Sequence, residues 1–210
     1  MSTTLKEASL AAVSIHDSLK EYQVPYKIFL RDSAKCQGAV TVNCVAVGVL
    51  SFDDEGRILL IQRASTDSMP DKWEIPGGGV DEDDHSILHA AVREFEEETG
   101  LKTISLGEQV GKDYLFFTST GNLVIKFNFV AEVERDKQLE RDDRGWIKVQ
   151  LDPMEHQDYL WASEEEVILD CVGKRDISFT SQQQKDVIIQ AFQLRRGRSE
   201  QSTSNSLVLL

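Results

Sequence analysis

The side chains best suited to bind a metal ion are concentrated in one short stretch of the chain. Residues 81 to 98 include eight acidic residues and one arginine, which is a net charge of -7. Glu94, Glu97 and Glu98 share one side of a helix at about 100° per residue. Their like charges repel each other without structural benefit, whereas three carboxylates suit a hard divalent cation. The alternative for any such run of charge is a solvated acidic face.

Three successive glycines precede this acidic stretch. They end the run from Trp73 to Gly79, which also contains Pro76. Because glycine has no Cβ atom, the carbonyl and amide groups of such a loop can approach an ion or a phosphate closely. The glycines and the carboxylates together therefore favour a site for a metal ion and a phosphorylated ligand over a simple acidic surface.

A helix predicted over residues 84 to 99 must position the carboxylates. Asp84 can cap the start of this helix, and Gly100 stands where a left-handed residue can end it. An apolar stripe at helical spacing indicates that one face packs on a core, and it consists of Ile87, Leu88, Ala91, Val92 and Phe95.

The chain outside this helix alternates strand-like and helix-like segments. The predicted strands are residues 40–50, 57–61, 115–118 and 123–133, with another near 146–149. Helices are predicted at residues 8–22, 163–170 and 182–194, and a strand or extended connector at residues 26–30. From residue 195 the chain lacks periodicity until its last apolar residues, which predicts a mobile tail.

The composition predicts one folded domain with extensions. The chain has 210 residues, 40% of them hydrophobic and 28% charged, and its net charge is -13. This acidity disfavours binding to a nucleic-acid backbone, because that affinity comes largely from Lys and Arg. No signal peptide or membrane-spanning segment is apparent, and three cysteines without a paired motif predict no disulfide framework. We therefore expect a soluble cytoplasmic protein without membrane contact.

Gly79 and the run from Arg93 to Leu101 resemble the signature of the Nudix hydrolase family. That signature is Gly, five residues, Glu, seven residues, then Arg-Glu-U-x-Glu-Glu-x-Gly-U, where U is a bulky apolar residue. Eight of its nine specified positions match at the correct spacing. His85 is the exception, because it stands where the signature has its first Glu and cannot supply the same negative charge.

The resemblance implies an α/β fold, a three-layer α/β/α sandwich with a mixed β-sheet. The Nudix domain is expected over residues 39–194. An N-terminal helix and extended lead-in over residues 1–38 would precede it, and the tail over residues 195–210 would follow it.

The resemblance also implies an enzyme that hydrolyses the diphosphate linkage of a nucleoside diphosphate attached to another group, or of a nucleoside triphosphate. Its cofactor would be Mg²⁺ or Mn²⁺, held by Glu94, Glu97 and Glu98 with the carbonyl of Gly78 or Gly79. These ions would neutralise the diphosphate and position a water for attack on phosphorus.

Several roles stay open from the sequence. Glu97 is expected to support catalysis through the metal, and either Glu94 or Glu155 is the base that activates water. Arg63 either contacts a substrate phosphate or is an exposed arginine without a function, and Arg93 orients a glutamate of the signature. The expected partner is a small-molecule nucleotide, with a possible homodimer.

Two other functions compete with hydrolysis. The replacement at His85 keeps a catalytically weak or inactive Nudix-fold module, which binds or senses a nucleotide, as an alternative. The other competing function is that of an acidic surface that binds a partner protein. The residues around the signature match none of the substrate-specific patterns of Nudix subfamilies, so the sequence does not select the nucleotide.

Overall fold

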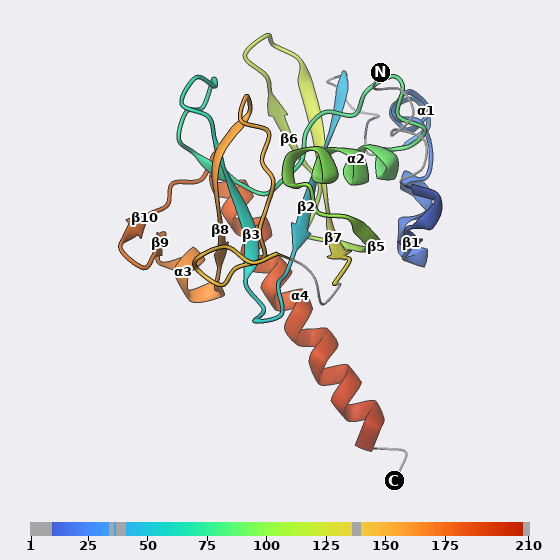
Figure 1. Cartoon of the computed structure of the whole chain (residues 1–210). Helices are drawn as coiled ribbons and strands as arrows, with labels where there is room; N and C mark the ends of the chain where they lie inside the picture. Colours follow the sequence, from blue (N-terminus) through green and yellow to red (C-terminus); the bar gives the residue numbers. More distant parts are fainter. Residues whose placement is uncertain (1–9, 34–35, 37–40, 136–139, 208–210) are drawn as a thin grey trace.

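The computed structural model describes residues 10–33, 36, 41–135 and 140–207 (Figure 1). The predicted N-terminal extension and tail therefore fall partly outside the described residues. Among the helices in these ranges, none combines the length and apolarity that crossing a membrane requires.

Two β-sheets form the centre of the molecule (Figure 1). The larger, mixed sheet has the order β1-β5-β7-β2, with β6 paired to β7; its strands are β1 (Ser14–Ile15), β2 (Cys44–Ser51), β5 (Thr103–Gln109), β6 (Tyr114–Phe117) and β7 (Leu123–Val133). The smaller, antiparallel sheet has the order β4-β3-β8; its strands are β3 (Ile58–Arg63), β4 (Trp73–Glu74) and β8 (His156–Ala162). A separate ribbon pairs β9 (Cys171–Val172) with β10 (Arg175–Asp176).

Helices pack on both sides of the sheets, which confirms the predicted layered α/β fold. Helix α2 (Ile87–Thr99) shares one core with the side chains of Val45, Val47 and Val49 from β2. Helix α4 (Gln182–Leu207) packs in a second core against Leu50 and the apolar residues of β3. Strand β2 is buried on both faces, so its sequence is almost continuously apolar.

Helix α2 ends as predicted but begins differently. Gly100 is left-handed, with φ of 67°, and ends the helix. The start is capped by Ser86, whose side chain accepts a hydrogen bond from the His89 amide, and not by Asp84. The carboxylate of Asp84 is therefore available for another contact.

The secondary structure predicted for the N-terminal segment was wrong. The described part of the predicted helix, residues 10–22, contains two 3₁₀ helices, η1 (Leu10–Ala12) and η2 (Asp17–Tyr22), with β1 between them. Residues 26–30 belong to helix α1 (Tyr26–Asp32). Pro25 precedes the first turn of α1, where its missing N–H costs nothing. Tyr22 stacks on Phe29 and packs against Phe127, so distant contacts override the local pattern.

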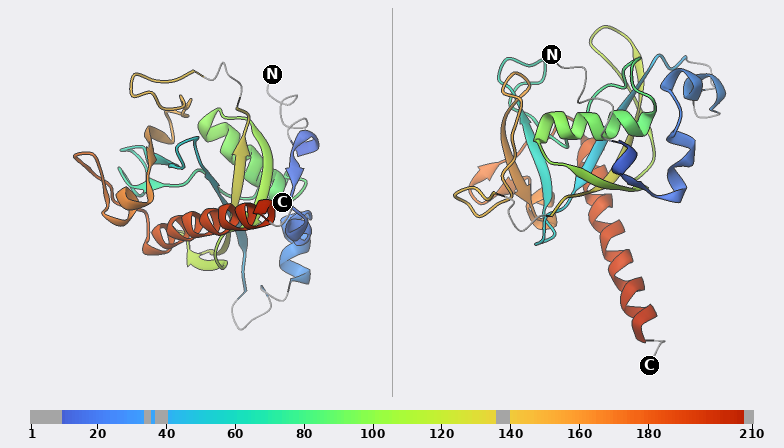
Figure 2. Two further views of the ribbon diagram at one scale, coloured as in Figure 1. Left: turned by 90° about the horizontal axis from the view of Figure 1, so that it is seen from below. Right: turned by 45° about the vertical axis from the view of Figure 1, so that its right-hand side comes forward.

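The C-terminal segment also differs from its prediction. Helix α3 (Glu164–Ile168) and the start of α4 confirm the two predicted helices, but α4 continues to Leu207 and projects from the body of the molecule (Figure 2). Ion pairs of Arg196 with Glu164 and of Arg198 with Glu108 connect the first residues of the predicted tail to α3 and β5. Residues 146–149 form no strand, only a bridge between Ile147 and Arg141.

Candidate active site

The glycine loop lies along strand β2. Val49 and Val47 donate backbone hydrogen bonds to the carbonyls of Pro76 and Gly78, at 2.8 and 2.9 Å. Between them, Gly77 has φ of 145°, and a Cβ atom there would lie 2.3 Å from the carbonyl oxygen of Val47. Only glycine can therefore hold the loop this close to the strand.

Glu98 is the carboxylate that this loop binds directly. It lies in the last turn of α2, is 5% exposed, and accepts a 2.6 Å hydrogen bond from the Gly77 amide. Burial raises the pKa of Glu98 well above its usual value, and the charges of Glu74, Glu94 and Glu155 add to this against the Gly77 hydrogen bond. A positive charge beside Glu98 would lower the pKa of this carboxylate again.

Gly78 and Gly79 lie against the other predicted ligands. A Cβ atom on Gly78 would lie 2.6 Å from Oε2 of Glu94, so the two residues are in close contact. The Gly78 carbonyl accepts from Val47, and the Gly79 carbonyl accepts from Arg93 at 3.2 Å. Each carbonyl keeps a second lone pair, so both can still serve as metal ligands.

Arg93 holds the carboxylates at the other end of the site. Its guanidinium donates two hydrogen bonds to Asp84, at 2.9 and 2.8 Å, one to Glu94 at 2.9 Å and one to Glu97 at 3.0 Å. These bonds, the Asp84 contact foremost, raise the pKa of Arg93. Burial acts to raise the pKa of Asp84, but the Arg93 hydrogen bonds outweigh it and lower that pKa. Arg93 therefore orients Glu94 and Glu97.

The carboxylate partner of Arg93 comes from the residue that precedes His85. His85 is exposed and hydrogen-bonds to no described residue, and its ring lies 5.2 Å from that of His89. His89 is buried and its Nδ1 lies 2.9 Å from the Asp84 carboxylate. Asp84 thus supplies the negative charge that His85 lacks.

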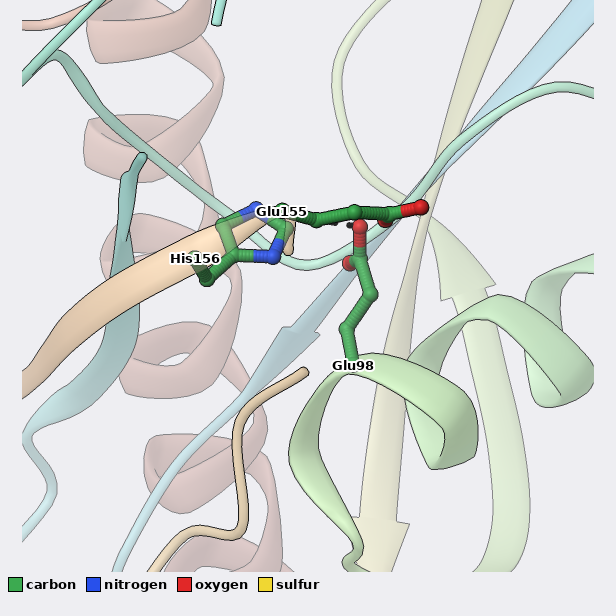
Figure 3. Close-up of side chains that lie close together, drawn as sticks. All are labelled: Glu98, Glu155 and His156. Atoms are coloured by element: carbon green, nitrogen blue, oxygen red, sulfur yellow. Dashed lines mark ion pairs between the residues drawn. The ribbon is translucent and has the colours of Figure 1, made fainter. Parts of the chain in front are cut away.

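Glu98 also belongs to a second group, with Glu155 and His156 (Figure 3). Glu155 is exposed in the loop before β8, and His156, the first residue of β8, is 3% exposed. One potential ligand atom from each of the three lies within 4.8 Å of the other two. The fold therefore brings the predicted base Glu155 to the end of α2 that carries Glu98.

Glu74 connects this group to Arg63. Arg63 donates a 2.5 Å hydrogen bond to Glu74 and bonds of 3.0 and 2.6 Å to Asp67. Burial acts to raise the pKa of Glu74, but His156, Lys126 and Arg63 together lower it. The guanidinium of Arg63 is therefore engaged by two carboxylates, and its contact with a substrate phosphate stays a prediction.

Lys126 faces the same carboxylates from strand β7. It is partly buried and forms no ion pair or hydrogen bond with a described residue. Burial lowers its pKa, and the charges of Glu74 and Glu98 act in the opposite direction. Gly48 leaves room for this side chain, because a Cβ atom there would lie 3.1 Å from Cε of Lys126.

Aromatic residues of β6 lie next to Lys126. Tyr114 pairs with Lys126 across the β6–β7 ladder and donates a 3.3 Å hydrogen bond to Gln184 of α4. Its burial raises its pKa to about 12. Phe116, on the same face of β6, has its ring 6.2 Å from that of Tyr114 and is 38% exposed. The aromatic surface thus reaches from Lys126 to the exterior.

The comparison with known families accounts for this combination of loop, helix and carboxylates. A model of the NUDIX domain matches residues 42–183, which is more than half of the chain. The chain belongs to the Nudix family. The match confirms the family that the resemblance indicated.

The curated relatives of this Nudix domain are distant in sequence. They include RNA pyrophosphohydrolases from Bartonella bacilliformis, 27% identical over 51% of this chain and 78% of the relative, and from Bartonella quintana, 36% identical over 37% of this chain and 47% of the relative. The chain matches less than half of the length of the latter, and 37% of the RNA pyrophosphohydrolase from Bartonella tribocorum.

Solved structures support the Nudix fold. The MutT protein from Methanosarcina mazei Go1 matches with a TM-score of 0.51 and 25% identity over 78% of this chain and 99% of that chain. A C. elegans Ap4A hydrolase matches with a TM-score of 0.54 and 19% identity over 74% of this chain and 99% of that chain. The second likeness concerns the fold alone.

The donor set of this Nudix site fits a divalent cation. Glu94, Glu97 and Glu98 offer carboxylate oxygens, which hard cations such as Mg²⁺ prefer. Glu98 fits best, since it is buried and its pKa is raised, whereas Glu94 and Glu97 share the charge of Arg93. The three predicted ligands are thus on one helix, but only Glu98 lacks an ion pair with a lysine or arginine among the described residues.

Lys126 and His156 belong to this site without having been predicted from the sequence, and Asp84 was predicted only as a helix cap. A signal existed for Lys126, because it interrupts the apolar run of β7. His156 stands directly after the predicted base. Asp84 was assigned to the helix cap, and only the structure reveals its bond with Arg93.

Proposed function

We propose that this chain is a metal-dependent Nudix pyrophosphohydrolase that cleaves a diphosphate linkage of a nucleotide or of an RNA 5′ end. The observation that carries the proposal is Glu98, a buried carboxylate with a raised pKa beside the glycine loop. The charged form of this carboxylate is costly to bury unless a cation binds there. The distant RNA pyrophosphohydrolases add the RNA 5′ end to the nucleotides that the signature suggests.

Each predicted site residue has a place in this proposal. Glu94, Glu97 and Glu98 would hold Mg²⁺ or Mn²⁺, with the carbonyl of Gly78 or Gly79 completing the ligand set. Bound ions would neutralise the diphosphate and lower the pKa of a bound water. Arg93 and Asp84 keep Glu94 and Glu97 in position, which removes the main reason to infer an inactive module from His85.

Lys126 is the candidate contact for the substrate phosphates. Its ammonium group lies near Glu74 and Glu98 but forms no hydrogen bond or close ion pair with a described residue, and a phosphate oxygen would supply such a contact. Arg63, by contrast, would act by keeping Glu74 in position, because both its partners are carboxylates. Tyr114 and Phe116 offer an aromatic surface for a base beside the phosphates.

The acidity of the chain limits how it can hold RNA. A net charge of -13 disfavours contacts with many backbone phosphates. We therefore propose that contact is confined to the terminal phosphates and the first base. Hydrolysis of a long RNA would then depend weakly on salt concentration.

A substrate panel tests this function. A 5′-triphosphorylated RNA oligonucleotide, free nucleoside triphosphates, a dinucleoside polyphosphate and nucleoside diphosphate sugars would be incubated with Mg²⁺ or Mn²⁺, and the released products identified by ion chromatography. We expect release of pyrophosphate or orthophosphate from the RNA end or of a nucleoside monophosphate from a small nucleotide. Binding of these ligands without product formation would instead support the regulatory module.

The same assay separates the two candidate bases. Glu94→Gln and Glu155→Gln each remove one carboxylate, and general-base catalysis contributes about 10²- to 10⁴-fold. The residue whose loss abolishes the rise of kcat with pH is the base. A variant that only raises the metal concentration needed for activity identifies a ligand.

A further inference from the structure

A cavity of about 250 Å³ lies where helix α4 passes the ends of strands β2 and β7 (Figure 1). Phe52, which lines it, directly follows β2. Gly48, which lies against Lys126, is four residues earlier, a distance of about 13 Å along an extended chain. The cavity is therefore separate from the glycine loop and the carboxylates of α2.

Three arginines line this cavity, although the net charge of the chain is -13. Arg135 follows β7, and Arg195 and Arg198 are neighbours on successive turns of α4. Among the described residues of the lining, Glu132 alone is acidic, so the wall of the cavity is positively charged. A concave surface with one sign of charge attracts ligands of the opposite sign. The cavity therefore favours an anion.

Two of the arginines are held by carboxylates outside the cavity. Arg135 donates a 2.7 Å hydrogen bond to Asp54, and Arg198 donates bonds of 3.2 and 2.7 Å to Glu108. Neither carboxylate belongs to the lining. A guanidinium has five N–H donors, so these bonds fix both side chains and leave donors for a ligand.

Gly107 makes room for the guanidinium of Arg198. It lies inside strand β5, and its φ is not positive, so its backbone conformation does not require glycine. A Cβ atom there would lie 3.2 Å from Nη2 of Arg198, which is closer than an ordinary contact. Glycine weakens a strand and commonly marks a close approach of another group. Here the approaching group is one of the three arginines.

We propose that this cavity, which we term the arginine cavity, binds a small phosphorylated anion through Arg135, Arg195 and Arg198. Guanidinium groups match the oxygens of a phosphoryl group in both charge and geometry. The volume is slightly below the about 300–1,000 Å³ of typical ligand pockets, so it suits one or two phosphoryl groups. The ring of Phe52 already has Arg195 at 5.0 Å and Phe192 at 5.2 Å, which leaves the phosphoryl group as the part that is recognised.

The test measures anion binding without a divalent cation. Pyrophosphate would be titrated by calorimetry into the full chain, freed of metal by dialysis, at low salt. Under these conditions the carboxylates of the candidate active site repel the anion. We expect saturable binding of one pyrophosphate per chain and a higher melting temperature, because a ligand of the folded state stabilises it. Parallel titrations with orthophosphate and a nucleoside monophosphate show which source of the phosphoryl group binds most tightly.

Variants locate the binding site. Arg195→Gln and Arg198→Gln should each weaken pyrophosphate binding about fivefold or more, because each removes charge-assisted hydrogen bonds. Gly107→Ala should weaken it with all three arginines present, because the added Cβ displaces Arg198. Arg196→Gln is the matched control, since Arg196 is exposed on the same helix and pairs with Glu164 outside the cavity. Its affinity should stay within about twofold of the wild type, which is the change expected from a distant, screened charge.

Lys126→Met separates the arginine cavity from the candidate active site, and it should leave pyrophosphate affinity unchanged. A loss of binding in this variant would assign the anion to the active site and overturn the proposal. The absence of saturable binding to the wild type, an equal loss in Arg196→Gln and Arg198→Gln, or binding of citrate as tight as that of pyrophosphate would also overturn it. Hydrolysis is not measured in these experiments, so their failure leaves the proposed function untouched.

Discussion

Two groups of carboxylates meet at helix α2 and differ in how their charge is compensated. At the first, which we term the paired cluster, Asp84, Glu94 and Glu97 surround Arg93. At the second, termed the open cluster, Glu98 and Glu155 meet His156, and none of the three has a cationic ion pair from Lys or Arg among the described residues. Glu94 of the first group and Glu98 of the second lie one turn apart on this helix.

The difference separates a structural role from a binding role. A buried carboxylate with an arginine partner has its charge satisfied within the protein, and the pKa of Asp84 is accordingly lowered. Glu98 is buried without such a partner, and its pKa is raised. A site that must bind a cation has to keep charge uncompensated in the free protein, at a cost in stability. The open cluster is therefore where a ligand is expected.

The largest effect is expected from Glu98→Gln, which removes the charge of the open cluster. The amide still accepts the Gly77 hydrogen bond, so the loop is retained. Metal-dependent hydrolysis should fall by at least about 100-fold, the upper loss seen for residues that only support a ligand. Thermal unfolding in EDTA should occur at the same or a higher temperature, because an uncompensated buried charge is gone. Lower stability together with full activity would reverse the roles of the two clusters.

Asp84→Asn should lower stability more than it lowers metal binding, because it breaks the paired cluster. It leaves Arg93 without its main partner, and loss of one member of a buried ion pair costs about 3 kcal/mol of unfolding free energy. Urea denaturation measures this loss. Metal affinity should fall less than in Glu98→Gln, because Asp84 acts on Glu94 and Glu97 only through Arg93.

A second variant tests whether the position of the negative charge matters. The double variant Asp84→Asn, His85→Glu moves the carboxylate to the position that the Nudix signature gives it. It should regain part of the lost stability. If the double variant is no more stable than Asp84→Asn, the bond between Arg93 and Asp84 depends on geometry that only the native position provides.

Lys126→Met should have a smaller effect, confined to substrate binding. Lys126 faces the open cluster but pairs with none of its carboxylates. Loss of its contact with a phosphate should raise KM about tenfold, which corresponds to about 1.4 kcal/mol. The change in kcat should be small, and Lys126→Arg should restore most of the affinity. A fall in kcat at unchanged KM would place Lys126 in the chemical step and not in binding.

The sequence predicted one cluster better than the other. Glu94, Glu97 and Glu98 follow from helical spacing, because neighbours three and four residues apart depend only on local geometry. His156 and Lys126 belong to strands β8 and β7. A local sequence pattern does not predict which strands will lie beside α2. The same limit explains the N-terminal errors, where Tyr22 packs on rings from a distant strand.

Asp84 illustrates a different limit of sequence reasoning. Its position just before the helix suits a cap, and the local pattern has no means to separate that role from an ion pair with Arg93. Ser86 satisfies the cap, so the Asp84 carboxylate is free for the arginine nine residues later. Two local rules compete here, and tertiary packing decides between them.

The smallest effect, the pH dependence of stability, should have opposite signs in the two clusters. The pKa of Asp84 is lowered in the folded state, so its contribution is present above the unfolded pKa and is lost as pH falls. The pKa of Glu98 is raised, so stability is greatest below the unfolded pKa and is lost as pH rises through the folded value. Melting temperatures in EDTA should therefore pass through a maximum at mildly acidic pH. Asp84→Asn should flatten the acidic side of that curve and Glu98→Gln the neutral side, by about 2–4 °C for each kcal/mol involved. If Glu98→Gln leaves the neutral side unchanged, the charge of the open cluster is compensated without a metal, and the contrast between the clusters fails.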